Sequence, residues 1–339
     1  MALRAGIVGF GGMGQRHYQA YQGTPCEVVA ICEWQPERVL KVVPGFPADH
    51  IYKDVHEMFA REQLDIVSVA SNGPTHAPIT IAAAEAGVRA ILCEKPSGTT
   101  LAEAEAVRDA AVRTGARIAV NHIRRWSPGY LALRARLQAG EFGALRHITY
   151  SSGSTGLGNF GVHAFDLMRF LSGAEPVWVV GALDRTGTPN PRGAEYVDPA
   201  GFGMIMFSNG MRGFVDSGED TGVNYMFTLV TEQARITIDE LSTRWTVRLR
   251  SEEARRAPFT RYGMPMEDLP CVSLPHDIVA QTRSAIVELA GDGPLSSPPA
   301  DGIRALELVM AFHESDARGQ SRVDLPLTGD ARGRRVPIA

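Results

Sequence analysis

Five short apolar runs alternate with five helical patterns over the first 120 residues of this chain. The apolar runs are "RAGIVGF", "VVAICE", "DIVSVAS", "RAILCEK" and "RIAV". Nearly continuous apolar strands that alternate with helices are typical of a parallel sheet covered on both faces. The helical patterns end at Gly23, Gly87 and Gly115, where glycine suits a left-handed C-terminal cap. This half of the chain therefore predicts a doubly wound α/β domain.

A glycine-rich loop follows the first apolar run. Gly9, Gly11 and Gly14 form G-x-G-x-x-G at the opening of the first helical pattern. The first glycine allows a tight turn, the second lets a pyrophosphate approach the backbone, and the third allows close contact between helix and strand. The helix N-terminus also attracts phosphates. We therefore expect Gly9, Gly11, Gly12, Met13 and Gly14 to bind a dinucleotide.

An acidic residue ends the second apolar run. Glu33 lies about 20 residues after Gly14, where a carboxylate hydrogen-bonds the adenosine ribose hydroxyls. The same carboxylate repels a 2′-phosphate, which favours NAD over NADP. Arg38 is close enough in sequence to bind such a phosphate, so NADP remains the less favoured alternative. The other interpretation of Glu33 is a solvent-facing acid at a strand end.

The second half of the chain has the pattern of an α+β unit. "FGMIMFSNGMRGFVDSG" predicts two strands around Asn209-Gly210, and "YMFTLVTEQARITIDE" and "TRWTVRLRS" show the alternation of further strands. Residues 252–274 are polar and predict a loop. Helical patterns resume after Pro275 and after Pro299. We expect domains at 1–121 and 122–339, with a final helix at about 299–318 that packs toward the first domain.

Charge and cysteine content exclude several classes of protein. The net charge is −4 and no basic block occurs, so nucleic acid is not an expected partner. No apolar run approaches the roughly 20 residues of a membrane span, and no secretory signal is evident. The cysteines show neither CxxC nor metal-ligand spacing, which predicts no disulfide, no metal site and a cytoplasmic location. They are Cys26, Cys32, Cys93 and Cys271.

The fourth apolar run ends in "CEKPSG", which places Lys95 between Glu94 and Pro96. The carboxyl edge of a parallel sheet is where ligands bind. Around this motif lie "ASNGPTHAPITIAAAEAG", "HIRRWSPGYLALRARLQAGEFGALRHITY", "GVHAFDLMRFLSG" and "PADGIRALELVMAFHESDARG". In this order and spacing the chain resembles the Gfo/Idh/MocA family, which includes glucose–fructose oxidoreductase and inositol dehydrogenases.

The resemblance implies a Rossmann dinucleotide-binding domain and a C-terminal α+β domain built on an open, mainly antiparallel sheet. Such a sheet commonly mediates oligomerisation, here into a homodimer or homotetramer. The resemblance also implies a cis peptide bond between Lys95 and Pro96. The cofactor site is expected to include, besides the glycine loop, Ser71, Asn72, His76, Glu94 and Lys95.

In the family the motif lysine and a helix histidine face the nicotinamide, and the histidine belongs to a DxGxH pattern. Here "GLGNFGVHAFD" gives Asn159 and His163, so an amide replaces the usual carboxylate. Asn159, His163 and Asp166 would share one polar stripe of a helix. We expect His163 to remove a hydroxyl proton, Lys95 to stabilise the alkoxide, and Asn159 to accept a hydrogen bond from His163. The alternatives are a structural histidine and a salt-bridged surface lysine.

Four further residues are assigned from the resemblance and from position. Arg124 matches an arginine that reaches the substrate in some relatives, and Asn121 ends the last apolar run on the nicotinamide side. Asp166 and Arg125 are expected to be structural. The implied function is NAD-dependent interconversion of a secondary alcohol and a ketone on a sugar, nucleotide sugar or cyclitol. The alternatives are a non-catalytic NAD-binding sensor and a reductase of a non-sugar carbonyl.

Overall fold

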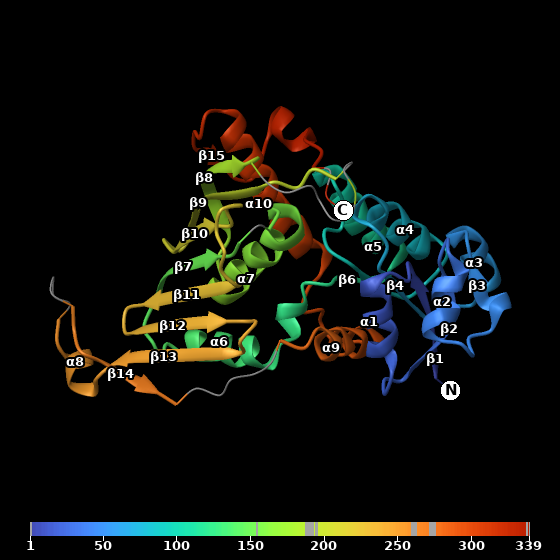
Figure 1. The fold of residues 1–339 in the computed structure, drawn as a ribbon, viewed down its shortest axis with the longest axis horizontal. Coiled ribbons are helices and arrows are strands. Elements are labelled where there is room, and N and C mark those ends of the chain that lie inside the picture. Colours follow the sequence, from blue (N-terminus) through green and yellow to red (C-terminus); the bar gives the residue numbers. More distant parts are fainter. Residues whose placement is uncertain are drawn as a thin grey trace.

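Two β-sheets account for most of the chain. The computed structural model describes residues 2–153, 155–186, 193, 196–258, 263–270, 276–336 and 338. The first sheet is formed within residues 3–120 and the second within residues 145–324 (Figure 1). The first is parallel and covered by helices on both faces, and the second is mixed. The structure confirms the expected fold class.

The first sheet has six parallel strands in the order β3-β2-β1-β4-β5-β6. The strands are β1 (Leu3–Val8), β2 (Cys26–Cys32), β3 (Ile51–Tyr52), β4 (Ile66–Val69), β5 (Ala90–Cys93) and β6 (Arg117–Val120). Five of them are the predicted apolar runs. The sixth, β3, was not predicted because a strand of two residues has no periodicity to detect.

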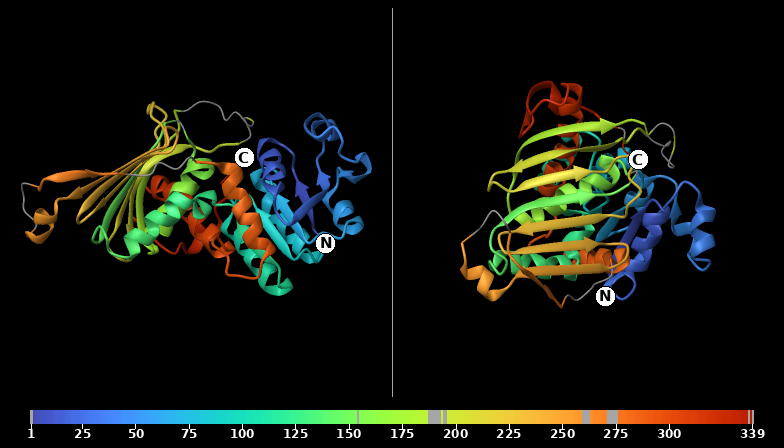
Figure 2. Two further views of the ribbon diagram at one scale, coloured as in Figure 1. Left: turned by 90° about the horizontal axis from the view of Figure 1, so that it is seen from below. Right: turned by 60° about the vertical axis from the view of Figure 1, so that its left-hand side comes forward.

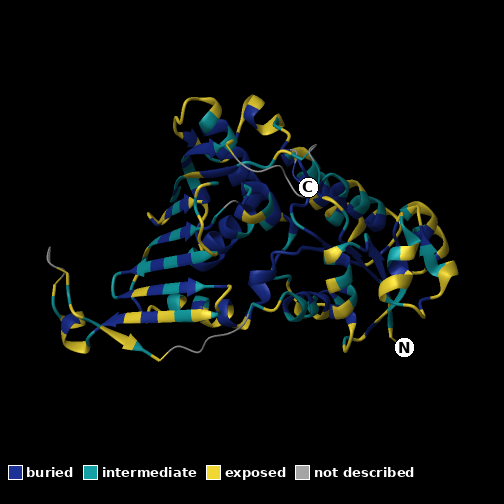
Figure 3. Cartoon of the chain, in the orientation of Figure 1, coloured by how far each residue is buried: buried dark blue, intermediate teal, exposed yellow. Residues whose placement is uncertain are grey.

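Five helices connect these strands, and the strands lie buried between them (Figure 3). They are α1 (Gly12–Tyr21), α2 (Pro36–Val42), α3 (Val55–Arg61), α4 (Gly73–Glu85) and α5 (Leu101–Thr114). The glycines predicted to end helices, Gly23, Gly87 and Gly115, have φ angles of 78°, 87° and 74°. These left-handed conformations confirm the predicted helix ends.

The strand register brings the candidate residues to one edge of the sheet. Val69 is paired with Val8 on one side and Cys93 on the other, and Cys93 is paired with Val120. The carboxyl ends of the central strands are therefore level. The residues that follow them emerge at one edge, among them Gly9, Glu94 and Asn121.

The second sheet has nine strands in the order β14-β13-β12-β11-β7-β10-β9-β8-β15. All neighbours are antiparallel except β7 and β10. The strands are β7 (Leu145–Ser151), β8 (Pro176–Asp184), β9 (Ala200–Phe207), β10 (Arg212–Asp216), β11 (Met226–Thr231), β12 (Ala234–Asp239), β13 (Arg244–Arg250), β14 (Met266–Leu269) and β15 (Val323–Asp324). The predicted hairpin at Asn209-Gly210 joins β9 to β10, and Gly210 has a φ of 81°.

One face of the second sheet is covered and the other is open. Helices α6 (Pro128–Gln138), α7 (Val162–Ser172) and α10 (Pro299–Ala317) lie on the covered face (Figure 2). Ile148, Ile205 and Phe227 point into the core beneath them. No described helix lies over the opposite face.

The last two helices bind the halves of the chain together. Helix α9 (Ile278–Ala290) packs against α1 and β5 of the first sheet, and Ile286 shares a buried cluster with Ile7 and Phe10. Helix α10 contacts α5 and β6 as well as α7 and β8. The Rossmann core is thus completed by a helix from the far end of the sequence.

The prediction of a loop at 252–274 was wrong for part of that segment. Helix α8 (Glu252–Arg256) and strand β14 lie within it, and β14 pairs with β13 through Leu269 and Val247. Strand β14 reads "MEDL", which is short, carries two acids as suits a sheet edge, and has too few residues to show a strand period. Cys271 and Pro275 lie outside the described residues. Cys26, Cys32 and Cys93 are free and buried.

Candidate active site

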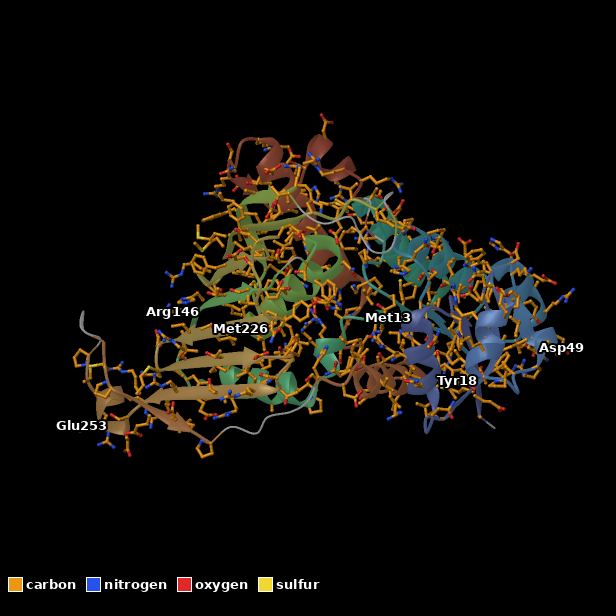
Figure 4. The ribbon with its side chains drawn as sticks, viewed as in Figure 1. Met13, Tyr18, Asp49, Arg146, Met226 and Glu253 are labelled. Carbon is orange, nitrogen blue, oxygen red and sulfur yellow. The ribbon has the colours of Figure 1, made fainter. Side chains whose placement is uncertain are left out.

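A cavity of about 270 Å³ lies between the carboxyl edge of the first sheet and the second domain. Met13, at the start of α1, forms part of its wall and marks the side that faces the second sheet (Figure 4). The wall also includes eight of the other predicted site residues: Ser71, His76, Glu94, Lys95, Asn121, Arg124, Asn159 and His163. The remaining predicted residues, Gly9, Gly11, Gly12, Gly14, Glu33, Arg38 and Asn72, do not line it.

The glycine loop has the shape needed to hold a pyrophosphate. A Cβ on Gly14 would lie 2.0 Å from the carbonyl oxygen of Gly9, and a Cβ on Gly9 would lie 2.7 Å from the Cα of Ser71. Gly11 and Gly12 instead face open space, because a Cβ on either would meet no atom within 4 Å. No side chain caps the N-terminus of α1 at Gly11. Gly9 and Gly14 are therefore required for close packing within the protein, whereas Gly11 and Gly12 leave backbone N–H groups open to an anion.

The carboxylate of Glu33 holds the glycine loop from the end of β2. Its Oε2 accepts a hydrogen bond from the backbone N–H of Phe10 at 2.8 Å, and its Oε1 pairs with Nη1 of Arg38 at 3.3 Å. Glu33 is only 3% exposed. A carboxylate has about four acceptor positions, so a ribose hydroxyl can still donate to it. The predicted acid is thus beside the loop, and Arg38 is its ion-pair partner.

Two residues predicted to bind cofactor brace neighbouring loops in the structure. The ring nitrogens of His76 lie 2.8 Å from the carbonyl oxygen of Pro96 and 3.1 Å from that of Ser71. Burial lowers the pKa of His76 below its ordinary value. Asn72 donates from Nδ2 to the hydroxyl of Tyr196 at 2.9 Å, a contact with the β8–β9 segment. His76 therefore joins the loops after β4 and β5.

Glu94 is buried in a polar cluster beneath Lys95. Its Oε1 lies 3.0 Å from Nε2 of His17 and accepts from Nδ2 of Asn121 at 2.7 Å. Burial raises its pKa, but His17, Lys95 and Asn121 outweigh this effect and lower the pKa of Glu94 to about 2. Asn121 is fully buried and acts here by holding Glu94. His17 was missed, although it lies one helical turn after Gly14 on the same face.

Lys95 is oriented by Asn159 across the cavity. Its Nζ donates to the backbone oxygen of Asn159 at 2.7 Å and to Oδ1 at 2.9 Å. Asn159 belongs to a π-helical turn, Leu157–Gly161, and this turn is held by Asp198. The carboxylate oxygens of Asp198 accept from the N–H groups of Gly158 at 2.7 Å and Asn159 at 2.8 Å.

The predicted hydrogen bond from His163 to Asn159 is therefore wrong. The spacing of four residues would place both on one face of an α-helix, but α7 begins only at Val162. The wider π turn directs the amide of Asn159 to Lys95 instead. Asp166 has the structural role expected of it, because it pairs with the buried Arg125 at 2.8 Å and lies outside the cavity wall.

His163 lies in the first turn of α7 with one ring nitrogen available to the cavity. Its Nδ1 is buried and has no hydrogen-bond partner among the residues that the structure describes. Because His163 lines the cavity, Nε2 is the nitrogen left to face it. Burial, followed by the charges of Lys95 and Arg124, lowers the pKa of His163 well below its ordinary value. The imidazole is therefore neutral at pH 7 and can accept a proton.

The far end of the cavity contains residues that sequence reasoning missed. Arg124 is paired there with Glu240, which directly follows β12. Phe160 and Tyr225 stack with ring centroids 5.1 Å apart. The other unpredicted wall residues are Arg16, Ile123, Leu241, His276 and Ile278. An acid closing the strand pattern "ARITIDE" was the available signal for Glu240.

Among the described residues no cluster of three or more potential metal ligands occurs, and none of the helices there has the length and apolar character needed to cross a bilayer. The cavity wall combines polar and aromatic side chains from both halves of the chain.

Comparison with known proteins agrees with both halves of the fold. Residues 3–122 match the family described as oxidoreductase family, NAD-binding Rossmann fold, and residues 149–240 match the GFO/IDH/MocA C-terminal domain. The levoglucosan dehydrogenase structure, a complex with NADH and levoglucosan, is 25% identical and has a TM-score of 0.79. That alignment covers 96% of this chain and 100% of the other.

Curated relatives include the D-apiose dehydrogenase of Paraburkholderia graminis, 31% identical over 188 residues, which are 50% of each chain. The inositol 2-dehydrogenase of Klebsiella pneumoniae is 31% identical over 186 residues, which are 50% of this chain and 55% of that one. The chain thus spans about half the length of the curated relatives it matches. The two domain families together cover more than half of the chain, in the order in which its two sheets occur. The chain therefore belongs to the GFO/IDH/MocA oxidoreductases, the family with an NAD-binding Rossmann fold.

Proposed function

We propose that this protein is an NAD-dependent dehydrogenase that interconverts a secondary alcohol and a ketone on a sugar, nucleotide sugar or cyclitol. The relatives named for D-apiose and inositol, a sugar and a cyclitol, support this substrate class. The observation that carries the proposal is the placement of Lys95 and His163 on one cavity wall with Met13 of the glycine loop.

The glycine loop would hold the pyrophosphate of NAD, and Glu33 the adenosine ribose. Bound there, NAD supplies the hydride acceptor for oxidation and, as NADH, the donor for reduction. The preference for NAD over NADP rests on Glu33, whose buried carboxylate would lie next to a 2′-phosphate.

The chain itself supplies the proton acceptor and the charge at the reacting oxygen. With the proton of the neutral imidazole on Nδ1, Nε2 of His163 accepts the hydroxyl proton. Lys95 donates from Nζ to the same oxygen and stabilises its negative charge. Asn159, through its two contacts with Nζ, limits the orientations open to Lys95. Asp198 positions Asn159 by holding its turn.

We further propose that copies of the chain associate through the open face of the second sheet. Trp178, Met204, Met206 and Phe214 lie on neighbouring strands of this face, and Phe202 is 50% exposed. An apolar face of this kind marks an interaction surface. Sedimentation equilibrium of the wild type and Phe214→Glu would test the interface, because a monomeric wild type contradicts it.

We also propose that the boundary between the two domains lies at 121/122. The three buried free thiols of the described residues support a further proposal, a cytoplasmic location.

The function is tested by NADH formation with a panel of cyclitols, aldoses and nucleotide sugars. We expect turnover with at least one polyhydroxylated ring, and its loss in His163→Ala while NAD still binds. A wild type that binds NAD and oxidises nothing in the panel would instead favour the non-catalytic sensor. Turnover confined to non-sugar carbonyls would contradict the proposed substrate class.

A further inference from the structure

A buried ion pair forms part of the cavity wall away from the glycine loop. Nε of Arg124 donates to Oε1 of Glu240 at 2.7 Å, and Nη2 donates to Oε2. Tyr130 donates from its hydroxyl to the same Oε1 at 2.6 Å. The side chains of Arg124 and Glu240 are 8% and 3% exposed, and both residues line the cavity. The charge of the arginine is therefore balanced inside the wall.

The guanidinium keeps one nitrogen available. Glu240 occupies Nε and Nη2, and Nη1 has no hydrogen-bond partner within the part of the chain that the structure describes. Because Arg124 lines the cavity, Nη1 is the donor that a ligand can reach. It offers N–H groups without a net charge, since the bidentate carboxylate lies on the other side of the same guanidinium.

The groups that act most strongly on this pair add no positive charge to it. His276 borders it, and burial together with Arg124 lowers the pKa of His276 below its ordinary value. His163 is neutral for the reason given above. Lys95 directly follows the ionised Glu94 in the chain. Arg16 is exposed on α1, beside the loop assigned to the pyrophosphate. Lys95 and Arg16 are the other cations of the wall, and neither is among the groups that act most strongly on Glu240. A ligand at Nη1 of Arg124 therefore first meets a guanidinium whose charge Glu240 balances.

These charges make a hydroxyl a better ligand than a carboxylate. A hydroxyl accepts from Nη1 at no electrostatic cost. A carboxylate in the same place would be a second anion on a guanidinium that already binds Glu240, in a site largely removed from water. The stacked Phe160 and Tyr225 give the neighbouring wall an apolar surface that suits the C–H groups of a sugar or cyclitol ring.

Building on the function proposed above, we propose that the Arg124–Glu240 pair selects an uncharged polyhydroxylated ring and rejects ring carboxylates. Glu240 is the residue that sets this preference, since it balances the charge of Arg124. The protein should oxidise neutral aldoses or cyclitols and discriminate against uronic acids with the same ring.

The test compares a neutral aldose with the uronic acid of the same ring, by NADH formation, in the wild type and in Glu240→Gln. Glutamine keeps the length of the side chain and an acceptor for Arg124, but removes the negative charge. We expect the wild type to favour the neutral sugar in kcat/KM by about tenfold or more, and the variant to reduce that ratio by about tenfold.

Tyr130→Phe is the matched control, because it removes one hydrogen bond to the same carboxylate and changes no charge. In Tyr130→Phe, the ratio of kcat/KM for the neutral aldose to kcat/KM for the uronic acid should equal that of the wild type. A wild type that oxidises the uronic acid as efficiently as the neutral sugar overturns the inference and leaves the proposed function standing. This measurement decides the question even if Glu240→Gln does not fold. A wild type that oxidises no ring of either kind overturns the proposed function, and the inference with it.

Discussion

Replacing Asn159 with aspartate tests the electrostatics of the site most directly. Oδ1 of Asn159 lies 2.9 Å from Nζ of Lys95, so the substitution places a carboxylate against an ammonium group. Two unit charges at this distance attract by about 1.4 kcal/mol in water and by about 6 kcal/mol at an effective dielectric constant of about 20. The cavity has an environment between these limits, so the perturbation is large enough to measure.

The substitution should move the acid limb of the pH–rate profile. His163 must be neutral to accept a proton, so oxidation slows as the pH falls below its pKa. Burial and the charge of Lys95 lower that pKa in the wild type, which places the acid limb below the ordinary histidine value of about 6.5. A carboxylate at position 159 offsets the charge of Lys95 and favours the imidazolium. We expect the limb of Asn159→Asp to move to higher pH by about 1 unit or more.

The assay is kcat/KM for the oxidised substrate at saturating NAD over a range of pH. Asn159→Ala is the control, since it removes the side-chain acceptor Oδ1 for Lys95, keeps the backbone acceptor and adds no charge. Asn159→Ala should lower kcat/KM, and its acid limb should not move to higher pH. His163→Ala should abolish the limb and most of the activity. An unmoved limb in Asn159→Asp together with an active His163→Ala would refute the assignment of the base.

The geometry supports three further predictions. Lys95→Ala should lower kcat by roughly 10² or more, with NAD affinity nearly unchanged in a fluorescence titration, and near-normal turnover would exclude the catalytic role. Glu33→Ser should narrow or reverse the preference for NAD over NADP, and a wild type with the lower Kd for NADP would contradict the assignment of Glu33. Gly14→Ala should lower the free energy of unfolding by about 1–3 kcal/mol, because its Cβ would meet the oxygen of Gly9. In the same urea titrations Gly12→Ala, whose Cβ meets open space, should change it far less, and equal losses would contradict this account.

Short sequence motifs predicted those site residues whose positions depend only on the end of one strand. Gly9 and Gly14 are constrained by one turn, and Lys95 by its place after β5, so their positions follow from short stretches of sequence. The parallel register then brings them to one edge without further information. The resemblance to the family, rather than the local pattern alone, identified His163 as the residue of the second domain expected to face the nicotinamide together with Lys95.

The unpredicted parts depend on contacts between distant residues. Glu240 reaches Arg124 only because the turn after β12 lies beside the short helix Ile123–Trp126, far earlier in the chain. His276 enters the wall through the placement of α9 on α1. Asn159 was assigned the wrong partner because a π turn and an α-helix cannot be distinguished from the spacing in "NFGVH". Tertiary contacts fix these features, and the periodicity of the sequence cannot reveal such contacts.

The position of α9 also has a consequence for the protein as it is synthesised. Strand β6 ends at Val120, whereas α9, which covers Ile7 and Phe10 through Ile286, begins at Ile278. At a synthesis rate of ~5–20 residues per second, α9 leaves the ribosome roughly 8–30 s after the last strand of the first sheet. During that interval the nascent dinucleotide-binding half has an apolar surface beside α1 that no later residue can yet cover. We therefore expect ribosome-bound chains halted before residue 278 to be captured by chaperones, and chains halted well beyond residue 290 to escape them.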